Sequence, residues 1–195
     1  MMQKFPGYDE AKVYVRYKKL PAGAYKVKIE HAEEVKFDGD GKGKALKVYF
    51  DILEGAFSAY FRDQYNQQPE GQKDWKGYLF LYCPKDGTEG TEPHARTVSA
   101  FKTNMNAIEQ SNGFTFNWDE NTLKDKLVCA VFAEKEWKWN GKTGIATKCH
   151  SFRTLAELEA GDIVIPPTKL LDKSPAAMLQ DATPLDENED ETLPF

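Results

Sequence analysis

Residues 25–52 have the sequence YKVKIEHAEEVKFDGDGKGKALKVYFDI, and its pattern is that of a β-hairpin. In each half, apolar residues alternate with polar ones, which is the spacing of a strand that buries one face. The first run begins at Tyr25 and extends toward Phe37, and the second runs from Leu46 to Ile52. Because the glycine-rich residues 38–43 join the two runs, the sequence predicts two antiparallel strands connected by a turn.

Further runs with strand character follow this hairpin. Residues 57–62 alternate in the same way, and residues 78–83 form a short apolar run. Residues 127–139 and 143–152 are rich in β-forming residues, and the Asn-Gly pair between them is a strong signal for a two-residue hairpin turn. The chain therefore predicts a sheet that is built largely from hairpins.

One segment between residues 83 and 127 changes to helical spacing. Thr97 is placed to cap the start of this helix, and Gly113 is placed to end it. The apolar residues that recur at three- and four-residue intervals are Val98, Phe101, Met105 and Ile108. A second, short helix is predicted at residues 155–159.

The order of these elements predicts a mainly β (α+β) fold. Strands, one helix between the third and fourth principal strands, and a final hairpin are the order of an OB-fold barrel. Other small α+β sheets fit the same pattern. We predict a domain over residues 1–165. Proline, alanine, serine and acidic residues dominate the rest, so we predict that residues 166–195 are a flexible linker and tail.

The net charge of −5 is concentrated at the C-terminus. Residues 181–195 contain six acidic residues and no basic one, so the rest of the chain carries 26 basic and 25 acidic groups. The body is thus close to neutral, with enough cations for a basic face. An ordinary enzyme has the same balance, so charge alone does not select nucleic acid as the partner.

The cysteines and the apolar runs indicate the compartment. Cys83, Cys129 and Cys149 are widely spaced and odd in number, which does not suit a disulfide framework. The N-terminal residues lack the apolar segment of a secretory leader, and no apolar run reaches membrane-spanning length. We therefore expect a soluble, cytoplasmic protein.

The predicted final hairpin combines aromatic and basic residues. Trp137 and Trp139 share one face of a strand, and Lys138 and Lys142 are interleaved with them around the turn. Nucleobases stack on aromatic side chains while ammonium groups follow the phosphates, so these four residues are candidates for DNA binding. Alternatively, one or both tryptophans cap the core, where tryptophan is often largely buried.

A second aromatic and basic group is expected on the polar faces of the early strands and in the loop after them. Its members, also candidates for DNA binding, are Lys26, Lys28, Lys47, Tyr49, Tyr60, Arg62, Trp75 and Lys76. The alternative is an ordinary solvated sheet face with cross-strand pairs. For Trp75, the alternative is a lid on one end of the barrel.

Catalytic and metal-binding patterns are poor in this sequence. Cys149 and His150 are adjacent, so on a strand they point to opposite faces and do not form a nucleophile–base pair. No motif for a zinc site, a phosphate-binding loop or a serine nucleophile is present. We therefore predict no catalytic residue, no metal and no cofactor.

The chain ends in an acidic run that closes on an apolar tip. Such a segment has too little apolar surface to fold alone, but it has the features of a ligand. The terminal ring can fill a pocket while the carboxylates meet basic groups. The candidate partner-binding residues are Asp190, Glu191, Leu193, Pro194 and Phe195. The alternative is a tail that only increases solubility.

Body and tail together resemble the phage-type single-stranded DNA-binding proteins of phages and mobile elements of Gram-positive bacteria. The supporting stretches are residues 20–25, 74–77, 136–137, 140–142 and 193–195. The resemblance implies an OB-fold body that binds single-stranded DNA without strong sequence preference and protects it. It also implies that the tail recruits replication, recombination and repair proteins in a bacterial host. Thr192 interrupts the acidic run just before the tip, which implies a lower affinity for those partners.

Two other classes of function fit parts of the sequence. A phage nuclease would need a carboxylate cluster at a metal, and the sequence shows no motif for one. An interaction adaptor would use the tail in the same way but bind protein through its body. The oligomeric state is left open, with a homo-oligomer among the alternatives.

Overall fold

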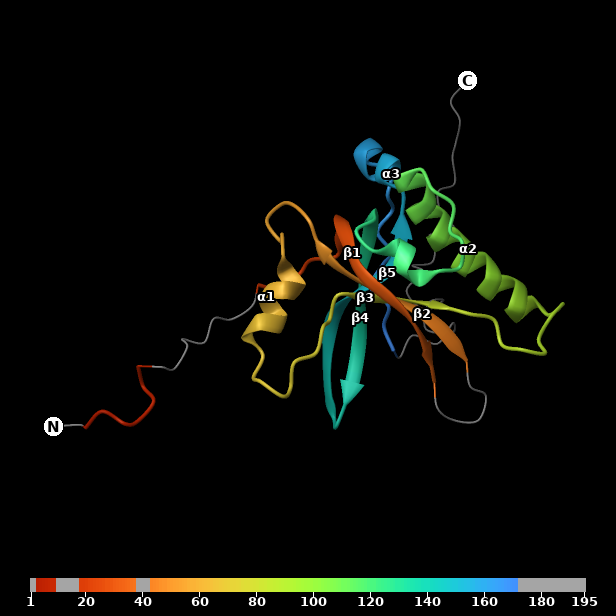
Figure 1. Cartoon of the computed structure of the whole chain (residues 1–195). Helices are drawn as coiled ribbons and strands as arrows, with labels where there is room; N and C mark the ends of the chain where they lie inside the picture. The colour runs from red at the N-terminus through yellow and green to blue at the C-terminus, as the bar shows by residue number, and fades with distance from the viewer. Residues whose placement is uncertain (1–2, 10–17, 38–42, 172–195) are drawn as a thin grey trace, which may run out of the picture.

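A computed structural model of the chain describes residues 3–9, 18–37 and 43–171. Its centre is one five-stranded sheet in which every neighbouring pair is antiparallel, with the strand order β3-β2-β1-β4-β5 (Figure 1). The elements in chain order are β1 Gly23–Lys36, β2 Lys44–Ile52, α1 Tyr60–Gln67, β3 Tyr78–Tyr82, α2 Glu92–Asn112, the 3-10 helix η1 Glu120–Leu123, β4 Leu127–Trp139, β5 Lys142–Arg153 and α3 Leu155–Ala160. The prediction of a mainly β fold is confirmed.

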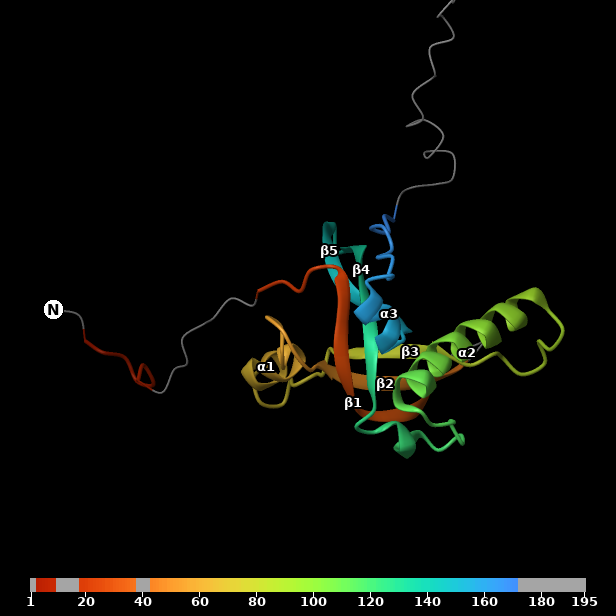
Figure 2. The same cartoon turned by 90° about the horizontal axis from the view of Figure 1, so that it is seen from above.

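The long strand β1 joins the two parts of the sheet. Its first residues pair with β4, from Gly23 opposite Phe132 onward, and most of its length pairs with β2 as the predicted hairpin. A register irregularity between Ile29 and His31 interrupts the pairing with β2. Irregularities of this kind bend a strand and increase its twist. The sheet therefore curves, as Figure 2 shows, and encloses its apolar face.

The core fills the concave side of the curved sheet. Aromatic rings from three strands meet there, with ring centroids 6.1 Å apart for Phe50 and Phe132 and 5.7 Å apart for Phe50 and Phe152. Helix α2 adds Met105 and Ile108, both buried. This helix and α1 lie at opposite flanks of the sheet (Figures 1 and 2), and both bury side chains in the same core.

Residues 57–62 were predicted as a strand, and this prediction is wrong because α1 begins at Tyr60. The buried carboxylate of Asp51, on β2, accepts the backbone N–H groups of Phe61 and Arg62 at 3.0 and 3.2 Å. The N-cap residue Ala59 supplies no side-chain cap, so Asp51 takes over that role from a neighbouring strand.

The other predicted elements are confirmed with shifted ends. Helix α2 begins before the predicted Thr97, because Thr91 caps it by accepting the backbone N–H of His94. It ends as predicted, with Gly113 in the left-handed conformation at φ 62°. The short helix α3 has a complete capping box between Thr154 and Glu157.

The two outermost strands, β3 and β5, do not pair with each other along the part of the chain that the structure describes. A hydrogen-bonded barrel is therefore not observed. Beyond β5 the chain stays attached past residue 165, where the domain was predicted to end: the N–H of Lys169 donates to Glu134 at 3.0 Å and its carbonyl accepts from Glu136 at 2.9 Å. Among the described helices, none is long and apolar enough to cross a membrane.

Candidate nucleic-acid interface

The outer face of β1, β2 and β3 carries an ordered set of aromatic side chains. Strand register places His31, Tyr49 and Tyr78 in one row across the three strands, and Glu33, Lys47 and Phe80 in the next. The third row contains Val35, Ala45 and Tyr82. On β2 and β3 the intervening residues are buried leucine, valine and phenylalanine, so the alternation separates core from surface. We call His31, Phe37, Lys47, Tyr49, Tyr78, Phe80 and Tyr82 the aromatic face.

The rings of the aromatic face touch one another along β3. Ring centroids are 5.2 Å apart for Tyr78 and Phe80 and 6.0 Å apart for Phe80 and Tyr82. Phe37, which follows β1, packs 5.6 Å from Phe80 and 5.9 Å from Tyr82. Tyr82 is still 57% exposed. The row therefore leaves ring surface open to a ligand.

Lys47 provides a positive charge among these rings. Its ammonium lies 4.4 Å from the ring centroids of both Tyr49 and Tyr78, and 5.6 Å from that of Phe80. Such cation–π contacts hold the charge over the rings. No described carboxylate forms an ion pair with Lys47. Its cross-strand neighbour Glu33 instead accepts a 2.6 Å hydrogen bond from the Tyr49 hydroxyl.

Tyr49 is held in place from two sides. Its ring stacks on His31 with centroids 4.1 Å apart and planes 14° from parallel. Burial and the hydrogen bond to Glu33 raise the pKa of the Tyr49 hydroxyl, so it stays protonated and keeps donating at neutral pH. The aromatic face therefore combines a fixed end, at His31 and Tyr49, with an exposed ring at Tyr82.

Of the candidates predicted on the early strands, Lys47 and Tyr49 lie on the aromatic face. The three other basic residues of that group are each neutralised by a carboxylate. Lys26 pairs with Glu54 at 3.7 Å, Lys28 with Asp125 at 3.3 Å, and Arg62 with Glu30 at 3.0 Å. These exposed or half-exposed ion pairs match the alternative interpretation, an ordinary sheet surface with charge pairs.

Tyr60, Trp75 and Lys76 are not on the aromatic face, although Tyr60 and Lys76 line the cleft that is described below. The Tyr60 ring packs 5.2 Å from Phe61 at the start of α1. The indole N–H of Trp75 donates to the carbonyls of Gly77 and Phe50, at 3.0 and 3.2 Å, which ties the loop to the sheet. Trp75 thus has the environment expected of a lid, and Lys76 pairs with the neighbouring Asp74.

The β4–β5 hairpin presents both tryptophans to solvent, with its tip pointing away from α3 (Figure 1). Trp139 is 72% exposed and lies opposite Lys142. Trp137 is 43% exposed and lies against Gly144, where an added Cβ would be 2.7 Å from the ring. Neither ring belongs to the core cluster, so they do not cap the core. Lys138 is exposed on the opposite face of the strand.

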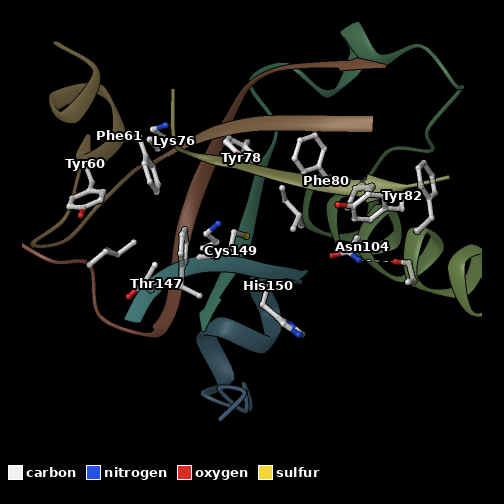
Figure 3. A pocket seen from close by; sticks show the side chains of 18 of the residues that line it. Tyr60, Phe61, Lys76, Tyr78, Phe80, Tyr82, Asn104, Thr147, Cys149 and His150 are labelled. Atoms are coloured by element: carbon white, nitrogen blue, oxygen red, sulfur yellow. Dashed lines mark hydrogen bonds between the residues drawn. The ribbon is translucent and has the colours of Figure 1, made fainter. Parts of the chain in front are cut away.

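A cleft of about 1060 Å³ separates the unpaired edges of β3 and β5. Its walls in Figure 3 show Tyr78, Phe80 and Tyr82 on β3, Thr147, Cys149 and His150 on β5, Tyr60 and Phe61 toward α1, and Asn104 on α2. The charged residues that line it are Lys19, Lys76, Arg96 and Lys148, and no described carboxylate lines it. Lys19, Lys76 and Arg96 pair with Glu134, Asp74 and Glu92 outside the cleft, whereas Lys148 forms no ion pair with a described carboxylate. Because Tyr78, Phe80 and Tyr82 line the cleft as well as the aromatic face, the cleft adjoins that face.

Five members of the aromatic face were not identified from the sequence: His31, Phe37, Tyr78, Phe80 and Tyr82. A signal for three of them was present in residues 78–82, which read YLFLY. Period-two alternation places the two leucines in the core and all three rings on the other side.

The three thiols are poorly suited to nucleophilic chemistry. Burial raises the pKa of Cys129 to about 11 and also raises the pKa values of Cys83 and Cys149, so all three stay protonated at neutral pH. The His150 ring contacts Ser151 Oγ at 3.3 Å. Within the described residues, no group of three His, Cys, Asp or Glu side chains is placed to hold a metal ion.

The candidate partner-binding residues Asp190, Glu191, Leu193, Pro194 and Phe195 lie outside the described residues. In comparisons with known proteins, no family model matches this chain and no curated protein matches it significantly. The arrangement of the described side chains is therefore what bears on function.

Proposed function

We propose that this protein binds single-stranded DNA on the aromatic face, with little dependence on base sequence. The observation that carries the proposal is the row of Tyr78, Phe80 and Tyr82 on one strand, with the ammonium of Lys47, which pairs with no described carboxylate, beside it. Rings of this kind stack on bases, and every base has a ring face to offer, which makes the binding tolerant of sequence. Lysine contributes attraction to the phosphates.

The same chemistry favours single strands over duplex. In a duplex the base faces are stacked on each other, and only base edges and phosphates are accessible. Aromatic side chains gain their stacking energy, roughly 1–3 kcal/mol per base, only from bases that are unstacked. A face that offers several rings and a single lysine therefore gains much less from duplex DNA.

The topology supports the proposal. The strand order β3-β2-β1-β4-β5, with α2 between β3 and β4, is the order expected of an OB-fold. In that fold, ligands bind on the second and third strands and on the hairpin loops. The aromatic face lies on β2 and β3, and the tryptophan-bearing hairpin is the connection between β4 and β5. Both positions are thus those that an OB-fold uses.

Recruitment of replication, recombination or repair proteins is a second part of this proposal. It rests on the acidic run and the Leu-Pro-Phe tip of the sequence, residues 186–195. An apolar ring beside a terminal carboxylate suits a pocket with a basic rim.

The proposal is tested by titrating intrinsic tryptophan fluorescence with oligo-dT and with duplex DNA over a range of salt concentrations. We expect preference for oligo-dT, and an affinity that falls as salt rises. Replacing Lys47 by Gln should weaken binding and make the log–log salt slope less steep by about 0.7, because one phosphate contact is lost. Lys124→Gln, at an exposed lysine outside the aromatic face, is the matched control. Equal affinity for duplex, or an unchanged slope in Lys47→Gln, would contradict the proposal.

The hairpin tryptophans give a second test. Trp139→Ala should weaken oligo-dT binding by about 1–3 kcal/mol if its ring stacks on a base, and should leave the melting temperature nearly unchanged because the ring is exposed. Trp137→Ala should cost less affinity, since Gly144 already covers part of that ring. Fluorescence anisotropy of labelled oligo-dT measures the affinities. If the variant that carries both Trp137→Ala and Trp139→Ala is folded and binds oligo-dT normally, the hairpin is not part of the interface.

A further inference from the structure

Trp118 is an exposed aromatic residue in a strained backbone conformation. It is 79% exposed, and its φ of 67° lies in the left-handed region, which bulky residues avoid. Strained conformations persist where the surroundings enforce them, and they cluster at functional sites. Here the next residue, Asp119, caps η1 by accepting the backbone N–H of Asn121 at 3.0 Å, which fixes the chain just after the tryptophan.

The strained conformation places the Trp118 ring against helix α2. The ring lies parallel to that of Phe101, with centroids 6.1 Å apart and planes 10° from parallel, and 5.7 Å from the ring of Phe116. Because most of its surface remains open to solvent, Trp118 forms a supported aromatic platform. Supporting rings reduce the motion of the platform, as in other preorganised binding sites.

This platform is connected to the aromatic face by the cleft between β3 and β5. Tyr82, Arg96 and Phe101 all line the cleft, so Phe101 contacts Trp118 at one side and faces the cleft at another. Lys102, next to Phe101, is exposed and forms no ion pair with any described carboxylate. The side chain of Asp119 is engaged at the start of η1.

We propose that single-stranded DNA leaving the aromatic face at Tyr82 continues past Arg96 and Phe101 and stacks a base on Trp118. The inference rests on the proposed function of the aromatic face and extends its path beyond the sheet. Lys148 in the cleft and Lys102 beside Phe101 form no ion pair with a described carboxylate, so both favour a polyanion along this route. Arg96 pairs with Glu92, but both side chains are largely exposed, and a phosphate can replace such a surface partner. The binding site is then longer than the sheet alone provides.

The test compares full-length wild-type protein with Trp118→Gly over a series of oligo-dT lengths from about 4 to 20 nucleotides, which brackets the site sizes of single OB-folds. Glycine suits the positive φ, so the variant should melt at the same or a higher temperature than the wild type. Short oligonucleotides, which fit on the aromatic face, should bind both proteins equally. For the longest ones the variant should bind about tenfold more weakly, the effect of one lost stacking contact.

Each other outcome overturns the inference. A loss of the same size at every length, with a lower melting temperature, would show that Trp118 only supports the fold. Normal binding at every length would assign the exposed ring to another contact, such as a protein partner. If Lys47→Gln binds oligo-dT more weakly than the wild type, as expected, while Trp118→Gly binds like the wild type, the proposed function stands and only the extension to Trp118 fails. If the wild type does not bind oligo-dT, both the proposed function and the extension to Trp118 are wrong.

Discussion

Replacing Phe80 and Tyr82 together by alanine should lower the affinity for oligo-dT by about 30-fold or more. Each ring that stacks on a base contributes roughly 1–3 kcal/mol, so losing two costs about 2–6 kcal/mol. Both lie on the outer face of β3 and contact Phe37, whose ring also loses its neighbours in this variant. The effect should therefore exceed that of any single substitution in the interface. Equilibrium titration monitored by fluorescence anisotropy measures it.

The matched control is the double variant Phe5→Ala and Tyr8→Ala. These residues also form an exposed aromatic pair, with ring centroids 5.3 Å apart, but residues 3–9 lie away from the sheet in both views (Figures 1 and 2). The control should bind oligo-dT like the wild type. Melting curves of both variants show whether the folded state is kept. If the two double variants bind equally well and the β3 variant is folded, the aromatic face is not the DNA-binding surface.

The second large effect is on stability: Gly77→Ala should lower the free energy of unfolding by about 3 kcal/mol or more. Gly77 is buried where the loop enters β3, and an added Cβ would lie 2.4 Å from the carbonyl oxygen of Phe50 and 2.6 Å from the ring of Phe61. The carbonyl belongs to a strand that also donates a 2.9 Å hydrogen bond to Gly77, so neither backbone moves away freely. Overpacking against backbone is among the costlier core changes.

Thermal unfolding followed by circular dichroism checks this expectation. A loss of 3 kcal/mol corresponds to a decrease of about 6–12 °C in melting temperature for a chain of this size. Gly43→Ala is the matched control, since no atom lies within 4 Å of its added Cβ and its backbone is not left-handed. It should melt within about 1–2 °C of the wild type. A Gly77→Ala protein as stable as Gly43→Ala would show that the close approach at Gly77 is relaxed in solution.

Local sequence patterns were sufficient to predict most of the sheet. The alternation from Tyr25 and from Leu46, and the Asn-Gly turn, each describe contacts within one hairpin, and the structure contains both hairpins. Helix α2 was also recognised because its apolar spacing and Gly113 are local signals. Its start was misplaced, because the cap at Thr91 precedes the apolar pattern.

Features that depend on contacts between distant segments were not predictable in this way. Helix α1 is capped by Asp51, which lies ten residues before Phe61 on strand β2. Residues 57–62 alone therefore resemble a strand. The aromatic face exists only because register places Tyr78 beside Tyr49. The platform at Trp118 requires a backbone conformation that no sequence pattern of tryptophan indicates.

The shared strand β1 also has a consequence for the order of folding events. Each hairpin pairs residues that are close in the chain, and such contacts form rapidly. Joining β1 to β4 brings Gly23 to Phe132, which closes a loop of about a hundred residues before the core is enclosed. Loop-closure entropy must be paid before that contact is stabilised. We therefore expect the rate of folding to be set by the docking of two preformed hairpins, with substitutions in the first residues of β1 slowing it most.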